Sequence, residues 1–249
     1  MPVLDDVLAT LPEGTISEVR VGAFWTAVVA EVQGQRRCGL ASTLTGDNDH
    51  HHTGVDDVTD AGRLTNYTGR QLATLAHSSS PLEVSVGMAT VNALLVPRPE
   101  HCVELNAEEV ILSEGAGRCV AVVGHFPFLP RCRAVAGKLW VLEKRPQGDD
   151  LPAEAAREVL PQADIVAMSA TTLMNRTFEE LIALCRPDAL VLVLGPSTPL
   201  SPVLFDYGVH ILSGSVVEDV DAVLRAVSEG ANFRQVRRYG VRLVTMRKP

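Results

Sequence analysis

The sequence predicts two domains: an α+β domain over residues 1–105, built from an antiparallel meander and helices, and a doubly wound, parallel α/β domain over residues 106–249. Three observations indicate this. The chain has 249 residues, 46% apolar and 21% charged, as in ordinary soluble globular proteins. After residue 108, short apolar runs alternate with helical patterns. Before it, closely spaced strand patterns are followed by helical ones.

The first domain is predicted from short segments taken in chain order. A short helix over 3–10 precedes three strands of an antiparallel meander, 16–22, 24–32 and 36–43. An acidic loop follows, and then helices near 66–77 and 81–96. The second of these begins with Ser80 and Pro81, which are favoured at helix starts, and its apolar residues lie on all sides, so we expect it to be buried. We place the boundary near 97–106.

In the second domain, runs rich in Val, Ile and Leu predict strands buried on both faces of a parallel sheet. These runs are residues 119–124, 138–144, 164–170, 189–195 and 209–214. The helical patterns are 151–160, 177–185 and 216–230. Thr177 and Glu180 have the spacing of a capping box, and Gly230 ends the last helix.

Charge is unevenly divided, and its pattern excludes several classes of protein. The net charge is −8; residues 1–105 hold 13 acids and 6 bases, whereas residues 106–249 hold 17 and 16. This disfavours general nucleic-acid binding. The basic stretch 234–248 is interpreted as a solvated edge or tail, with a partner contact as the alternative. No apolar run reaches 18 residues and the start has no basic segment, so we expect neither membrane span nor secretory signal and a cytoplasmic location. Five cysteines without CxxC spacing fit a reducing compartment.

The loops that follow the predicted parallel strands are the expected ligand site, because ligands of open α/β sheets bind beyond the carboxyl ends of the strands. These loops combine small residues with hydroxyls or amides, which suit a phosphate or carboxylate. They contain Gly124–Pro127, Glu143–Arg145, Ser169–Asn175, Gly195–Leu200 and Ser213–Ser215.

Each candidate side chain in these loops has a functional and a structural interpretation. His125 is a candidate general acid or base, or a histidine hydrogen-bonded at the domain interface. Glu143 is placed for a ribose hydroxyl, or is an exposed charge at the strand end. Thr172 and Asn175 bind ligand or cap a helix. Ser197 lacks a GxSxG context, which disfavours a nucleophile.

Two features of the first domain add candidates. Asn92 lies among apolar residues of a helix and needs hydrogen-bond partners, either in a neighbouring loop or in the interdomain cleft. His50 and His52, among the aspartates of the 47–60 loop, are candidate ligands for a divalent transition metal. The alternative for this loop is a solvated segment without a specific metal.

Five segments occur in order along the chain: LEVSVGMATVNALL, VVGHFPFL, LEKRP with QGDDLP, SATTLMNRTFEELI and LGPSTPLSPVLFDYGVHILSGSVVEDVD. Together they resemble the heavy-metal-chelation family, which pairs an enolase-N-terminal-like domain with a Rossmann-like domain. The resemblance implies a site in the crevice between the domains. The matching positions are Gly124, His125, Phe126, Glu143, Thr171, Thr172, Asn175, Gly195, Pro196, Ser197, Thr198 and Gly214, with Asn92 from the first domain.

We therefore expect the chain to bind a small polar or anionic ligand in the interdomain cleft, in heavy-metal chelation or in metallophore or cofactor metabolism. One alternative is a non-catalytic metal- or metallophore-binding protein. Another is an enzyme dependent on S-adenosylmethionine or a nucleotide, which the absence of GxGxxG disfavours. The expected partner is a small molecule or metal chelate rather than nucleic acid or membrane, and a homo-oligomer is left open.

Overall fold

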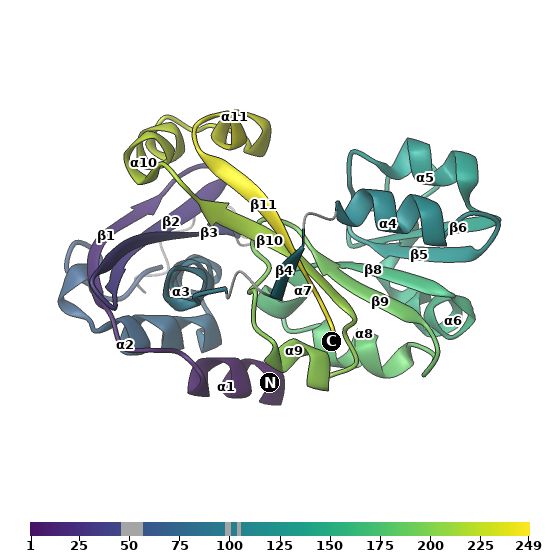
Figure 1. Ribbon diagram of the computed structural model, residues 1–249, viewed down its shortest axis with the longest axis horizontal. Coiled ribbons are helices and arrows are strands. Elements are labelled where there is room, and N and C mark those ends of the chain that lie inside the picture. Colours follow the sequence, from purple (N-terminus) through teal and green to yellow (C-terminus); the bar gives the residue numbers. More distant parts are fainter. Residues whose placement is uncertain (46–56, 98–100, 104–105) are drawn as a thin grey trace. The chain divides into compact units, whose positions relative to one another are not determined.

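The computed structural model describes residues 1–45, 57–97, 101–103 and 106–249 (Figure 1). The chain forms two compact units. The meander unit comprises Asp5–Val96 and Ser215–Leu243, and the sheet unit comprises Met1–Leu4, Pro97–Gly214 and Val244–Pro249. The compact units therefore differ from a single division at residue 105, because residues 215–243 pack with the first part of the chain.

The meander unit contains the predicted antiparallel sheet, in the order β1-β2-β3. Its strands are β1 (Thr15–Val21), β2 (Trp25–Val32) and β3 (Gln35–Ser42). Gln33 and Gly34, with φ of 51° and 75°, form the tight turn between β2 and β3. The residues of β2 are buried on both faces, apart from Glu31, so both faces of this sheet must be covered.

Helix α3 (Pro81–Leu94) covers one face, against β2 and β3. Ser80 accepts a hydrogen bond from the N–H of Glu83 and Pro81 occupies the first turn, as predicted. The helix is buried on nearly all sides, which confirms the expectation from its sequence. The shorter elements α2 (Gly69–Ala73) and η2 (Thr74–His77) pack against it, and η1 (Leu64–Asn66) contacts β1.

The opposite face of the meander is covered by residues from the end of the chain. Helix α10 (Val220–Ser228) contacts β1 and β2, and α11 (Phe233–Arg238) contacts α10. The Trp25 and Phe233 rings lie 5.3 Å apart between their centroids. Alternate β2 residues join this core, as expected for a strand whose side chains alternate between its two faces.

The sheet unit is organised around a mixed, mostly parallel eight-stranded sheet, in the order β4-β11-β10-β9-β8-β5-β6-β7. Its strands are β4 (Cys102–Val103), β5 (Cys119–Val123), β6 (Lys138–Glu143), β7 (Leu151–Pro152), β8 (Ile165–Ser169), β9 (Leu190–Leu194), β10 (Ile211–Val217) and β11 (Val241–Arg247). Strands β5 to β10 run parallel, and β11 pairs antiparallel with β4. All five predicted parallel strands are present.

Short helices lie between these strands. They are α4 (Ala107–Glu114), α5 (Leu129–Val135), α6 (Ala156–Val159), α7 (Thr171–Met174), α8 (Phe178–Leu184) and α9 (Val203–Asp206), with α1 (Pro2–Ala9) at the start of the chain. Apolar residues of α4 and α5 pack with the strands in one core. The 3₁₀ turns η4 (Ala153–Ala155) and η5 (Leu160–Gln162) flank α6. In the described ranges, no helix is long and apolar enough to cross a membrane.

Two local predictions are wrong, and a third is right only in part. The pattern 216–230 begins as strand, since β10 extends to Val217 and the helix starts after Asp219, whose side chain accepts from the N–H of Ala222. Thr177 makes no capping-box bond, because its hydroxyl donates to Asn175 instead. The basic side chains of the stretch 234–248 are exposed, as expected for a solvated edge. The stretch is not a tail, however: it forms all but the first residue of α11 and all of β11, where Val244, Thr245 and Met246 are buried.

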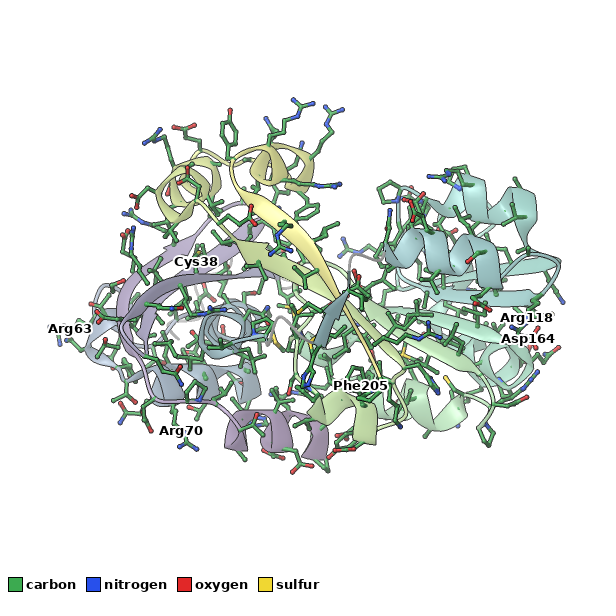
Figure 2. The ribbon with its side chains drawn as sticks, viewed as in Figure 1. Cys38, Arg63, Arg70, Arg118, Asp164 and Phe205 are labelled. Atoms are coloured by element: carbon green, nitrogen blue, oxygen red, sulfur yellow. The ribbon has the colours of Figure 1, made fainter. Side chains whose placement is uncertain are left out.

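The amino ends of the parallel strands are joined by a polar network around Asp164. One carboxylate oxygen accepts from the N–H of Cys119 at 2.9 Å, and the other accepts from Arg186 at 3.2 Å. Arg118 lies beside Asp164 (Figure 2), 4.0 Å from Nε to Oδ2. This carboxylate therefore aligns the starts of β5 and β8, and leaves the loops at the opposite, carboxyl edge for other roles.

Glu83 is a buried carboxylate whose charge should stabilise the meander unit. It accepts hydrogen bonds from the N–H of Thr59, at 2.7 Å, and from the Ser78 hydroxyl. Burial alone raises the pKa of Glu83, but these hydrogen bonds outweigh it and hold the pKa below its ordinary value. Its contribution is therefore complete above the unfolded-state pKa of about 4.3 and is lost as the pH falls through the lower, folded value.

We expect Glu83→Gln to lower the free energy of unfolding at pH 7 by about 1–3 kcal/mol, because a charged acceptor of two hydrogen bonds is removed. Urea unfolding at pH 7 and at pH 3 measures this, and the gap from the wild type should narrow at pH 3. The exposed Glu31→Gln serves as the control, with a change within about 0.5 kcal/mol. A gap that stays constant with pH would contradict the role given to the carboxylate.

Candidate functional site

The strand order places a topological switch point between β5 and β8. From β5 the chain adds β6 and β7 on one side, and it returns to add β8, β9 and β10 on the other. Ligands of open α/β sheets bind at the carboxyl ends of the strands beside such a point. Here those ends lead into the loops that begin at Gly124 and Ser169.

The two loops approach each other closely at the switch point. Gly124 has φ of +108°, and a Cβ added to it would lie 2.9 Å from Cβ of Ser169. Only glycine combines this backbone angle with the available space. The backbone of the β5 loop is therefore held against β8 at the predicted ligand edge.

The hydroxyls and amide of the β8 loop are engaged with one another. The Ser169 and Thr171 hydroxyls are 2.8 Å apart, and Thr172 Oγ1 donates to the Ser169 carbonyl at 2.8 Å. Asn175 Oδ1 accepts from both the N–H and the hydroxyl of Thr177. These bonds lie within the loop and are not the helix caps named as the structural alternative, because neither α7 nor α8 begins with a side-chain cap. A ligand role for Thr172 and Asn175 stays a prediction.

The loop after β9 differs, because it contains buried hydroxyls without partners. Gly195, with φ of +118°, donates its N–H to the Ser213 carbonyl, and the Thr198 N–H donates back to the Gly195 carbonyl. Thr198 and Ser201 are 2% and 1% exposed. Within the described ranges, Thr198 Oγ1 and Ser201 Oγ have no hydrogen-bond partner. A buried hydroxyl without a hydrogen-bond partner lowers the stability of the fold, so these two hydroxyls call for an explanation.

The other predicted residues of this loop help to shape it. Ser197 is 2% exposed and Pro196 is partly buried. A Cβ added at Gly214 would lie 2.6 Å from the Thr198 carbonyl oxygen. Gly214 therefore lets β10 pack directly against the Thr198 backbone.

His125 faces a pocket of about 500 Å³ beside the switch point. Its Nδ1 lies 3.3 Å from Oδ2 of Asp150, which also accepts from the N–H of Gln147 at 3.2 Å. The His125 side chain is 58% exposed, whereas that of Asp150 is 5% exposed. We call this space the His125 pocket; it is lined by His125, Leu129, Pro130, Arg133, Ala134, Gln147, Asp149 and Asp150.

Sequence reasoning missed Asp150, which lies 25 residues after His125. The only signal was the acidic pair Asp149–Asp150 in the loop after the second predicted parallel strand. Local pattern does not say which of two adjacent acids turns inward.

Two further predicted residues have local roles at this edge. Phe126 stacks on Phe128, with ring centroids 5.2 Å apart. Glu143 ends β6 and accepts a hydrogen bond from the N–H of Lys144 at 3.1 Å. Neither contact tests the ligand roles predicted for them.

The candidates from the first part of the chain lie in other surroundings. Asn92 Nδ2 donates to the Leu40 carbonyl at 2.8 Å, which ties α3 to β3. His50 and His52 lie outside the described residues. Among the residues that are described, no three His, Cys, Asp or Glu side chains gather as ligands for a metal ion.

Comparison with family models identifies both parts of the chain. Residues 4–95 and residues 106–246 match two models, DUF4213 and DUF364, that share the description "Putative heavy-metal chelation". The second match alone spans more than half of the chain. The chain belongs to the heavy-metal-chelation family. The resemblance noted in its sequence is thereby confirmed, while the likeness of its first domain to the enolase N-terminal domain stays a prediction.

Two solved structures share the fold of this chain over nearly its whole length, and a further relative matches most of its sequence. A crystal structure of a DUF364-family protein from Desulfitobacterium hafniense DCB-2 is 26% identical, with a TM-score of 0.85 over 99% of this chain and 98% of that one. A DUF364-family structure from Pyrococcus horikoshii, 19% identical, has a TM-score of 0.80 over the same shares and shows the fold alone. An uncharacterized protein of Methanocaldococcus jannaschii is 25% identical over 209 residues, 80% of this chain and 78% of its own.

Proposed function

We propose that the protein binds a small polar or anionic ligand, a metal chelate or its precursor, at the carboxyl edge of β5, β8 and β9. The observation that carries this proposal is the pair of buried, unpartnered hydroxyls of Thr198 and Ser201 in the loop after β9. A ligand with polar atoms would supply the missing hydrogen bonds, and family membership supports the chelate as its class. The predicted location between the domains stays a prediction.

An enzyme acting on a chelator or its precursor is a second candidate. The hydrogen bond between His125 and Asp150 favours it, because a histidine oriented by a carboxylate suits general acid–base chemistry. The S-adenosylmethionine alternative has no specific observation in its favour. Turnover of a chelator precursor that is lost in His125→Asn would favour the enzyme over the binding protein.

The hydroxyl of Thr198 should reduce stability and support binding, and Thr198→Val separates the two effects. Removing an unpaired buried hydroxyl at nearly constant volume should raise the free energy of unfolding by about 1 kcal/mol, or the melting temperature by roughly 2–4 °C. The same change should weaken ligand binding about 10-fold, the equivalent of about 1.4 kcal/mol. Thermal shift and calorimetry measure both, with a panel of nickel, copper and zinc chelates, nucleotides, pterins and S-adenosylmethionine.

Thr245→Val is the matched control, because the Thr245 hydroxyl is also buried but donates to Ser213 at 3.2 Å. It should lower the free energy of unfolding by about 1 kcal/mol and leave ligand affinity unchanged. The proposed function fails if no member of the panel stabilises the wild type. It also fails if Thr198→Val and Ser201→Ala both retain wild-type affinity for the stabilising compound.

A further inference from the structure

The His125 pocket offers one side chain, His125, that is suited to coordinate a metal ion. The Asp150 side chain is only 5% exposed, and a carboxylate only accepts hydrogen bonds, so His125 Nδ1 carries the proton and donates it. The lone pair of the imidazole then resides on Nε2, on a side chain that is more than half exposed. Histidines that bind metals are commonly held by a carboxylate in this way, with the other ring nitrogen as the ligand.

The rest of the pocket suits an anionic organic molecule around such a metal ion. Arg133, on α5, lines the pocket, and its nearest acidic partner, the exposed Asp149, lies 3.9 Å away. Its guanidinium is therefore only loosely paired and is able to bind a carboxylate of a ligand. Leu129 and Ala134 supply apolar wall, and the volume of about 500 Å³ fits a small chelate.

The side chains that line the His125 pocket favour a metal chelate over a bare metal ion. His125 is the one candidate nitrogen ligand among the lining residues, and the Asp150 carboxylate already accepts hydrogen bonds from His125 and from the N–H of Gln147. A single imidazole binds a bare ion weakly, whereas it readily completes the coordination of an ion that already has a chelator. Imidazole nitrogen suits zinc, copper, nickel and iron.

We propose that His125 is the protein's ligand to a transition-metal ion that arrives in a carboxylate-bearing chelate. Nε2 displaces a water from the metal, the Nδ1 proton stays in its hydrogen bond to Asp150, and no electron is transferred. Asp150 is the positioning residue for His125, and Arg133 pairs with a carboxylate of the chelate. The inference rests on the proposed function and names its ligand class.

The experiment compares two nickel chelates that differ in open coordination positions. Nickel nitrilotriacetate retains positions occupied by water, whereas in nickel ethylenediaminetetraacetate the chelator occupies them all. Both are measured by calorimetry on the full chain with His50, His51 and His52 changed to Ala, so that these histidines contribute nothing. In this background, we expect only the nitrilotriacetate complex to bind.

The variants then separate ligation from a general histidine effect. His125→Asn should weaken binding of nickel nitrilotriacetate more than 10-fold, whereas His101→Ala, at another exposed histidine, should leave it unchanged. Arg133→Gln should weaken binding less than His125→Asn does. Asp150→Asn should lower the affinity for nickel nitrilotriacetate about 10-fold, and Asp150→Glu should keep most of the wild-type affinity. A merely structural role for Asp150 would not explain this difference. With copper nitrilotriacetate, the visible absorption band should shift to shorter wavelength on binding, and not in His125→Asn.

The inference is overturned if His125→Asn keeps its affinity, if the two nickel chelates bind equally, or if the copper band does not shift. If a compound still binds in a Thr198-dependent manner under those results, the proposed function stands and only the role of His125 fails. If no compound stabilises the chain, both fail.

Discussion

Phe178→Ala should lower the free energy of unfolding by about 3–5 kcal/mol, the cost expected for removing a fully buried aromatic ring. Phe178 is 0% exposed and heads the largest fully buried side chains among the described residues. It lies on α8, which packs against α6 and η5 beside the parallel sheet. The ring has no exposed edge, so its removal leaves a cavity that the surrounding short helices fill only in part.

Guanidinium chloride unfolding measures this loss, and the melting temperature should fall by roughly 6–10 °C. Phe24→Ala is the matched control, because Phe24 is 55% exposed and its removal should change stability by no more than about 0.5 kcal/mol. A loss below about 1 kcal/mol for Phe178→Ala would show that the side chains around α8 are not tightly packed.

Gly39→Val should destabilise the meander unit by about 3 kcal/mol or more, because no space for a side chain exists at this position. A Cβ at Gly39 would lie 2.1 Å from the Ala89 carbonyl oxygen and 2.2 Å from the Ala93 nitrogen. Both are backbone atoms of α3, so the clash is relieved only if the helix moves away from β3. The Asn92–Leu40 hydrogen bond opposes that movement.

Gln35→Val introduces the same side chain into the same strand at an exposed position, and should change stability by no more than about 0.5 kcal/mol. Valine favours strands, so any loss in Gly39→Val comes from the contact with α3 and not from strand propensity. Urea unfolding of both variants provides the comparison. Equal stability of Gly39→Val and the wild type would mean that α3 does not approach β3 as closely as described.

The pattern of apolar residues along the chain was sufficient to predict the elements in which that pattern is strong. The five Val-, Ile- and Leu-rich runs became parallel strands, and the apolar helix after Ser80 became the buried α3. The pattern misplaced the start of α10, because residues of β10 up to Val217 are as apolar as those of the helix that follows. It also missed that Thr177 bonds to Asn175, since one hydroxyl serves either purpose equally well.

The candidate site was predicted at the level of loops and not of partners. The loops after β5, β8 and β9 were expected at one edge because their strands were predicted to run parallel. The parallel pairing of β5 with β8 and of β8 with β9 agrees with that expectation. Whether a hydroxyl in them is satisfied depends on its neighbours in space. Thr172 is bonded within its loop, whereas Thr198 is not, and both are threonines in similar sequence surroundings.

The sequence by itself determined the family, the meander and the parallel strands, because these depend on residue period, turn residues and motif order along the chain. Only the tertiary structure decided that residues 215–243 cover β2, that β11 lies within the large sheet, and that Asp150 turns inward to His125. Each of these joins residues far apart in the chain. Their pairing is selected by burial and by the satisfaction of polar groups in three dimensions, which a local pattern does not encode.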